Sequence, residues 1–183
     1  MLLRLSHRFE APVRAVIDAL SSQEYAAQLA AEHSFFAQVD VLARLEQGDL
    51  VTRTVRYRAR PFIARLGVFS LPADWFVWLE QSVFDRRRGV LHFENVPESS
   101  LVRGKVINRG TMSFHAQRRA DGSWCTTRDA DFEIDLCVGP LYRPLTELML
   151  SMMRRQLASS LDEEARLLTA WLGRSSRLDT VAA

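Results

Sequence analysis

The chain has 183 residues, a length typical of a single domain. Hydrophobic residues make up 48% of it and charged residues 25%, a balance that suits a folded globular protein and excludes a disordered chain or a fibrous repeat. The formal net charge of +2 is too small to indicate binding to nucleic acid or to an anionic membrane.

The chain begins with a predicted strand and two predicted short helices. Residues 2–10 alternate between apolar and polar side chains, the period of a half-buried strand. Pro12 suits the first position of a helix, and apolar residues follow it at helical spacing. Ser21 and Glu24 form a capping box, which predicts a second helix that ends near Ala31.

Beyond residue 35 the period returns to two, and turn residues divide the pattern into six further strands. Asp121-Gly122 is the strongest hairpin signal among these turns. The predicted strands lie at residues 35–45, 51–59, 75–85, 89–96, 105–116 and 124–138.

The last element is a long amphipathic helix. From Leu145 to Leu172, leucines and methionines recur every three or four residues, which predicts a helix of roughly 30 residues and about 45 Å. Residues 174–183 carry no such pattern, so we expect a flexible tail after a single domain at residues 1–173.

The spacing of the two cysteines and the lack of targeting segments indicate the compartment of the protein. Cys125 and Cys137 fall in one predicted strand, roughly 40 Å apart at ~3.3 Å per residue, too far for a disulfide. The first residues contain no apolar stretch of signal-peptide length, and no stretch is long enough to span a bilayer. We expect a reduced, cytoplasmic protein without a metal or another cofactor.

An antiparallel sheet with one apolar face must cover that face, and the final helix is the only element long enough to do so. Strand, two short helices, six strands and a long helix is an order that resembles the helix-grip fold of the START-like (SRPBCC) superfamily, over residues 2–172. Three local patterns support the resemblance: Phe9-Glu10-Ala11-Pro12-Val13 with Val16 and Leu20 at the first strand-to-helix transition, Gly110-Thr111-Met112 at the start of the penultimate strand, and Val138-Gly139-Pro140-Leu141 before the last helix.

The resemblance implies an α+β fold in which a curved seven-stranded antiparallel sheet wraps around the C-terminal helix and leaves a cavity. Within the superfamily the chain looks most like an uncharacterised branch without an assigned activity, so no catalytic residue is carried over. We therefore expect binding or transport of a hydrophobic small molecule, such as a lipid, a sterol-like compound or a polyketide. A solidly packed interior is the alternative.

Apolar side chains and a few polar ones on predicted inward faces are the candidates for binding this ligand. The candidate residues are Arg53, Trp75, Val77, Glu80, Asn108, Met112, Phe114, Arg128, Phe132, Met149, Met152 and Met153. Glu94 and His7 are further polar residues that can point inward. A buried arginine needs a carboxylate, either a glutamate of the protein or a group of the ligand. Each polar residue can instead be solvated at a strand end or turned outward by a bulge.

The connection from Arg60 to Asp74 is long and apolar, which suits a lid over the cavity, a permanent plug or a flap that touches a membrane. Two other functions remain open. The first is an aromatase/cyclase-type enzyme, for which polar groups of the cavity would act as acid and base. The second is a protein-interaction module like the chaperone activators of the superfamily. The sequence contains no catalytic motif, and it leaves the oligomeric state undefined.

Overall fold

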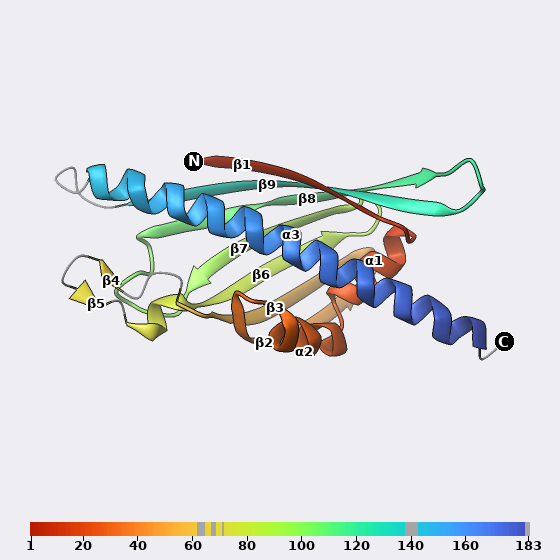
Figure 1. The fold of residues 1–183 in the computed structure, drawn as a ribbon, viewed down its shortest axis with the longest axis horizontal. Helices are drawn as coiled ribbons and strands as arrows, with labels where there is room; N and C mark the ends of the chain where they lie inside the picture. Colours follow the sequence, from red (N-terminus) through yellow and green to blue (C-terminus); the bar gives the residue numbers. More distant parts are fainter. Residues whose placement is uncertain (62–64, 67–68, 71, 138–142, 182–183) are drawn as a thin grey trace.

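The computed structural model describes residues 1–61, 65–66, 69–70, 72–137 and 143–181. Within them, seven strands form one antiparallel sheet in the order β1-β9-β8-β7-β6-β3-β2. The strands of this sheet are β1 (Leu2–Phe9), β2 (Phe36–Gln47), β3 (Leu50–Ala59), β6 (Val77–Asp85), β7 (Val90–Pro97), β8 (Val106–Arg118) and β9 (Trp124–Leu136). The helix α3 (Arg143–Val181) lies diagonally across one face of the sheet (Figure 1).

This is the predicted helix-grip fold, with two short helices, α1 (Val13–Leu20) and α2 (Gln23–Glu32), after the first strand. They lie beside the C-terminal half of α3 (Figure 1). The Ser22 hydroxyl accepts a hydrogen bond from the backbone N–H of Tyr25 and so caps α2. Across the described residues, no helix combines the length and the apolar character that crossing a membrane requires.

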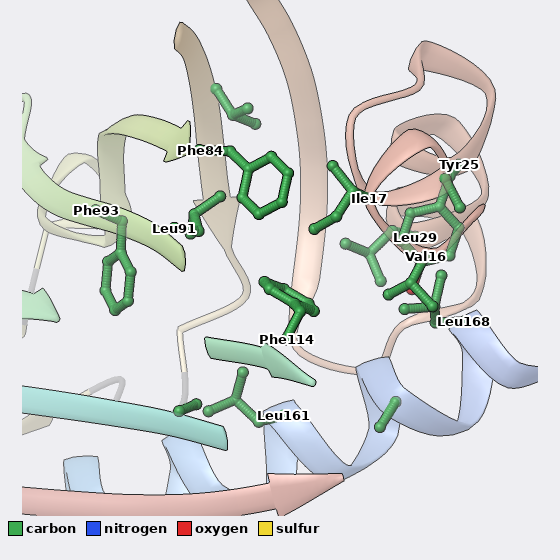
Figure 2. Packing of buried hydrophobic residues seen from close by; sticks show 14 of the residues in the cluster. Val16, Ile17, Tyr25, Leu29, Phe84, Leu91, Phe93, Phe114, Leu161 and Leu168 are labelled. Carbon is green, nitrogen blue, oxygen red and sulfur yellow. The ribbon is translucent and has the colours of Figure 1, made fainter. Parts of the chain in front are cut away.

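The hydrophobic core lies between the sheet, α1, α2 and the C-terminal half of α3. Figure 2 shows Phe84, Leu91 and Phe114 of the sheet on the side that faces Ile17. It also shows Tyr25 and Leu168 packed together, and Leu168 is fully buried. The two helices therefore wedge between the sheet and α3 and close this end of the molecule.

Gly110 allows β8 and β9 to approach closely under an aromatic side chain. A Cβ atom at this position would lie 2.0 Å from the carbonyl oxygen of Asp131 and 2.9 Å from the ring of Phe93. The Phe93 ring packs against Phe132 with a centroid distance of 5.0 Å. Gly110 lies within β8 rather than at the start of the penultimate strand, where the resemblance had placed it.

The edge strand β2 departs from the predicted alternation of residues 35–45. Register shifts occur between Phe36 and Gln38 and between Val41 and Ala43. The second shift inserts a residue, so Leu45, predicted to point inward, is 56% exposed. A bulge leaves no mark on the hydrophobic pattern, because the apolar residues beyond it still alternate.

Two predicted element boundaries were also wrong. Trp75 and Phe76 belong to a 3₁₀ helix, η1 (Ala73–Phe76), and the strand begins only at Val77. The last helix continues to Val181 instead of ending near Leu172, so residues 174–181 are helical. The prediction ended the helix too early because an apolar stripe shows only which part of a helix packs against the protein, and the backbone can stay helical beyond that part. Cys125 and Cys137 are both free.

Replacing Gly110 by alanine should lower the free energy of unfolding by about 1–3 kcal/mol, because the added Cβ meets a backbone carbonyl that cannot move aside. Urea denaturation measures this change. Gly173→Ala in α3 is the matched control, since its Cβ would have nothing within 4 Å. The control should leave stability unchanged or raise it by up to about 1 kcal/mol. Equal losses in the two variants would contradict the close approach.

Candidate functional site

A buried ion pair fastens the C-terminal half of α3 to the sheet. The Nη1 atom of Arg128, on β9, lies 2.8 Å from Oε2 of Glu164, and the Arg128 side chain is fully buried. The Arg128 guanidinium also lies over the ring of Phe9, 5.4 Å from its centroid. Its Nη2 lies 3.2 Å from Nδ1 of His7. A charge in this position requires its partner.

Neighbouring residues of α3 make further bonds, and we call residues 160–164 the anchor segment. The Nε2 of His33 donates to the carbonyl oxygen of Ser160 over 2.9 Å, while its Nδ1 accepts the N–H of Phe35 over 3.0 Å. The backbone N–H of Ser34 donates to Glu163 over 3.0 Å. Burial raises the pKa of Glu163, but the hydrogen bonds from Ser34 outweigh this and hold it below its usual range. The anchor segment is thus tied to both β9 and the end of α2.

The second predicted inward-facing arginine, Arg53, is also paired within the protein. Its Nη2 lies 2.6 Å from Oε1 of Glu80 on the adjacent strand, and its Nε lies 3.1 Å from Oγ of Ser82. Its Nη1 donates to the carbonyl oxygen of Leu20 at the end of α1. Burial lowers the pKa of Arg53, but Glu80 outweighs this and raises the pKa above its ordinary value, so the guanidinium stays charged. Neither arginine therefore offers a free charge to a ligand. Glu94, a further candidate for an inward position, is exposed on the outer face instead.

A cavity of about 190 Å³ lies at the other end of the sheet, beneath the first turns of α3. Side chains from η1, β6, β7, β8, β9 and α3 surround it. The residues lining it are Phe35, Trp75, Phe76, Val77, Trp78, Asn95, Pro97, Val102, Val106, Asn108, Ile134, Leu136, Met149, Met153, Gln156 and Leu157. Most of them are apolar, and none of these described residues has a titratable side chain.

The pairing of the strands explains where the cavity forms. The ladder between β7 and β8 ends at the pair Glu94–Arg109, although both strands continue beyond it. From there the strands separate toward the start of α3 (Figure 1). The register places Asn95 opposite Asn108 just past the last pair, on the inner face. The end of the ladder therefore leaves space beneath the helix and two amide side chains at its edge.

Three of the residues that line the cavity each have a buried side-chain atom without a hydrogen-bond partner. These atoms are Nε1 of Trp75, Oδ1 of Asn95 and Oδ1 of Asn108. Burying such an atom unpaired costs about 1–3 kcal/mol, so native proteins rarely contain three in one place without a reason. A ligand that bonds to these atoms would remove this cost.

An aromatic cluster forms one wall of the cavity. The ring of Trp78 stacks on Tyr57 with a centroid distance of 5.6 Å and lies 6.3 Å from the ring of Phe35. Burial raises the pKa of Tyr57, so its hydroxyl group stays neutral behind this wall. The cluster holds Phe35 and Trp78 in place and gives the cavity a flat, rigid side.

The predicted site residues fall into two groups in the structure. Trp75, Val77, Asn108, Met149 and Met153 line the cavity. The others do not: Phe114 and Phe132 lie in the packed core, Met112 packs against that core, Met152 is half-buried on α3 beside the cavity residues, and Arg53, Glu80 and Arg128 form the internal ion pairs.

Several lining residues were not predicted, and Asn95 is the most informative of them. It alternates in phase with Leu91 and Phe93 on β7, the same signal that identified Asn108 on β8. The alternation of inward-facing residues along this strand could therefore have identified Asn95 as a lining residue. Gln156 and Leu157 of α3 carry no comparable signal, because a helical stripe does not say which of its residues faces a cavity and which faces the core.

The predicted lid, from Arg60 to Asp74, lies partly outside the described residues, which omit 62–64, 67–68 and 71. In the part that is described, β4 (Arg65–Leu66) pairs with β5 (Phe69–Ser70). The segment then leads into η1, which carries Trp75 and Phe76 to the cavity.

A wider groove of about 720 Å³ lies mainly on the outer face of the sheet and is less suited to an apolar ligand. Its charged side chains already pair across the strands, as Arg109 Nε does with Glu133 at 2.8 Å. The hydrogen bond from Arg109 holds the pKa of Glu133 below its usual range. No group of three or more possible metal ligands occurs among the residues that the structure describes. The candidate site is therefore the inner cavity.

Comparisons with known proteins support the fold but not a specific family. No family model matches the chain. No curated protein matches it in sequence either. Among solved structures, the protein TTHA0849 from Thermus thermophilus is 17% identical, with 93% of this chain and 98% of that chain covered and a TM-score of 0.62.

Two solved structures with named activities are also similar. Norcoclaurine synthase from Thalictrum flavum, solved with dopamine and hydroxybenzaldehyde, is 12% identical, with 92% of this chain and 86% of that chain covered and a TM-score of 0.55. The Zhui aromatase/cyclase from Streptomyces sp. R1128 is 14% identical, with coverage of 97% and 94% and a TM-score of 0.50. At these identities the likeness shows the fold alone, which is the helix-grip fold.

Replacing Glu164 by glutamine should lower the free energy of unfolding by about 3–5 kcal/mol, because Arg128 would keep its charge in a buried position without a counterion. Thermal or urea denaturation measures the loss. Glu133→Gln provides the matched control, since it breaks the exposed pair with Arg109 and should change stability little. If the two variants unfolded at the same urea concentration, the ion pair would not be what fastens α3.

Proposed function

We propose that the protein binds a small hydrophobic molecule in the cavity between α3 and the sheet. The observation that carries the proposal is a mostly apolar cavity, three of whose lining residues each have an unpartnered polar atom. Ligand sites typically combine such an apolar lining with a few polar groups that orient the ligand. Removing apolar surface from water would supply most of the affinity, at roughly 25 cal/mol per Å².

The size of the cavity limits the ligand. A cavity of about 150 Å³ lined by apolar side chains is enough to bind benzene. The present cavity, of about 190 Å³, suits a molecule of one or two rings. Drug-sized ligands occupy pockets of about 300–1,000 Å³. A sterol-like compound or a full-length polyketide, which the sequence also suggested, would need α3 or η1 to move outward.

An aromatase/cyclase-type enzyme is the second candidate, because the chain shares its fold with the Zhui aromatase/cyclase. Acid–base catalysis needs a group that gains or loses a proton near the substrate. The described residues that line the cavity offer only the two asparagines, Gln156 and the Trp75 indole as polar groups. Arg128, which the sequence offered as a ligand-binding candidate, binds Glu164 in the core instead. This arrangement favours binding over catalysis.

A protein-interaction module of the chaperone-activator type would use a filled interior and an exposed apolar patch. The cavity, with its unpartnered polar atoms, supports small-molecule binding instead.

Naphthalene is a suitable probe, since it is apolar and has two rings. It should bind saturably and raise the midpoint of thermal unfolding, with about 1.4 kcal/mol of stabilisation at ten times its Kd. Met153→Trp should weaken binding at least tenfold, because Met153 lines the cavity and the larger side chain would fill it. Isothermal titration calorimetry measures both affinities.

Met152→Trp is the matched control, as the preceding residue on α3 does not line the cavity. It should bind naphthalene like the unchanged protein. The proposal fails if naphthalene causes no shift in thermal unfolding and native mass spectrometry of the purified protein finds no retained ligand. It also fails if the two tryptophan variants bind naphthalene equally well.

A further inference from the structure

We infer that the natural ligand is an uncharged ring compound that carries a hydroxyl group and that Trp75, Asn95 and Asn108 recognise this group. The inference rests on the proposed function and adds the chemical class of the ligand. It depends on which atoms at the cavity lack partners rather than on the cavity's volume.

The three unpartnered atoms require opposite kinds of hydrogen-bonding group. The indole Nε1 of Trp75 can only donate, so the ligand must bring an acceptor. The Oδ1 atoms of Asn95 and Asn108 can only accept, so the ligand must also bring a donor. A hydroxyl group is the smallest uncharged group that does both: its oxygen accepts from Trp75, and its hydrogen is donated to one of the two asparagine oxygens. A pure hydrocarbon would leave all three atoms unpaired, and an ether or a ketone would leave the asparagines unpaired.

Charge argues against an acidic ligand. A carboxylate would satisfy Trp75 but would face two asparagine oxygens, and no described lining residue carries a positive charge. The arginines on the inner face cannot supply one, because Arg53 is bound by Glu80 and Arg128 by Glu164. A ligand ammonium group would lack a counterion in the same way and would meet the Trp75 N–H. Burying an unpaired ion is far more costly than burying a hydroxyl group.

The shape of the wall indicates that the hydroxyl group is attached to a ring. Phe35, Trp75 and Trp78 all line the cavity, and the Phe35 and Trp78 rings lie 6.3 Å apart. Flat aromatic surfaces pack well against a planar ligand. The flexible side chains of Met149 and Met153 close the opposite side from α3 and can adapt to its outline.

The test compares three bicyclic probes of similar size by calorimetry at neutral pH: naphthalene, 2-naphthol and 2-naphthoate. We expect 2-naphthol to bind about tenfold more tightly than naphthalene, the effect of one or two hydrogen bonds to groups otherwise left unpaired. We expect 2-naphthoate to bind more weakly than naphthalene.

Variants then assign the preference to residues. Trp75→Phe removes the donor and keeps a ring, whereas the double variant Asn95→Leu/Asn108→Leu removes both acceptors at similar volume. Each should reduce the ratio of the naphthalene Kd to the 2-naphthol Kd about threefold, and combining them should bring the ratio to about one. Gln81→Leu, an amide replacement on the outer face of β6, should leave the ratio unchanged. Circular dichroism and the midpoint of thermal unfolding show that each variant folds.

The outcomes separate the inference from the proposed function. If no probe binds in a way that Met153→Trp blocks, both are wrong. If naphthalene and 2-naphthol bind equally well, or if 2-naphthoate binds most tightly, the cavity binds ligands but the inference about their class is wrong. A preference for 2-naphthol that persists in the combined variant would also overturn the assignment to these three residues.

Discussion

The ion pair between Arg128 and Glu164 is the interaction on which the arrangement of the molecule depends. It joins the inner face of β9 to α3 at a point where the Arg128 side chain is fully buried, and the rest of the anchor segment adds bonds from His7, His33 and Ser34. A buried pair of this kind fixes the positions of the two elements that it joins, because each charge is costly to bury without the other. Its net contribution to the free energy of folding is smaller, since both charges lose their hydration. Here it fixes the height of the helix above the sheet at one end, and the core of aromatic and aliphatic side chains fills the space around it.

The other end of α3 lies over the cavity, and the sheet itself opens there. The ladder between β7 and β8 stops at Glu94–Arg109, so the strands separate just where the helix would otherwise need side chains to fill the gap. The result is a division of the interior into a packed half and a hollow half. Unpaired polar atoms and empty space both reduce stability, which is commonly the cost of a functional site. The packed half of the interior compensates for this loss of stability and keeps α3 in place when the cavity is empty.

The sequence was sufficient to predict the fold. Apolar and polar residues alternate along each strand and apolar residues form a stripe along the last helix, because in both cases one side of the element faces the core. The same phase argument placed Arg53 and Arg128 on the inner face, where they lie in the structure, but it could not place Glu80, because its strand is apolar on both faces. It could not show which inward residues surround a cavity, because that depends on where strand pairing ends and on how α3 crosses the sheet. Phe114 and Asn108 share one face of one strand, yet Phe114 lies in the core and Asn108 at the cavity. The bulge in β2 was equally invisible, because it changes the register without changing the pattern of residue types.

The central claim is that the hollow half of the interior receives an aromatic ligand. Intermolecular nuclear Overhauser effects between bound 2-naphthol and the protein test it most directly, with the methyl groups of methionine, valine and threonine and the tryptophan indoles selectively labelled. Contacts from the ring protons to the methyl groups of Met149 and Met153, and to the indole of Trp75, are the result that this account predicts. Contacts confined to outer-face residues such as Val83 and Thr111, or to no labelled methyl group at saturating probe, would contradict it.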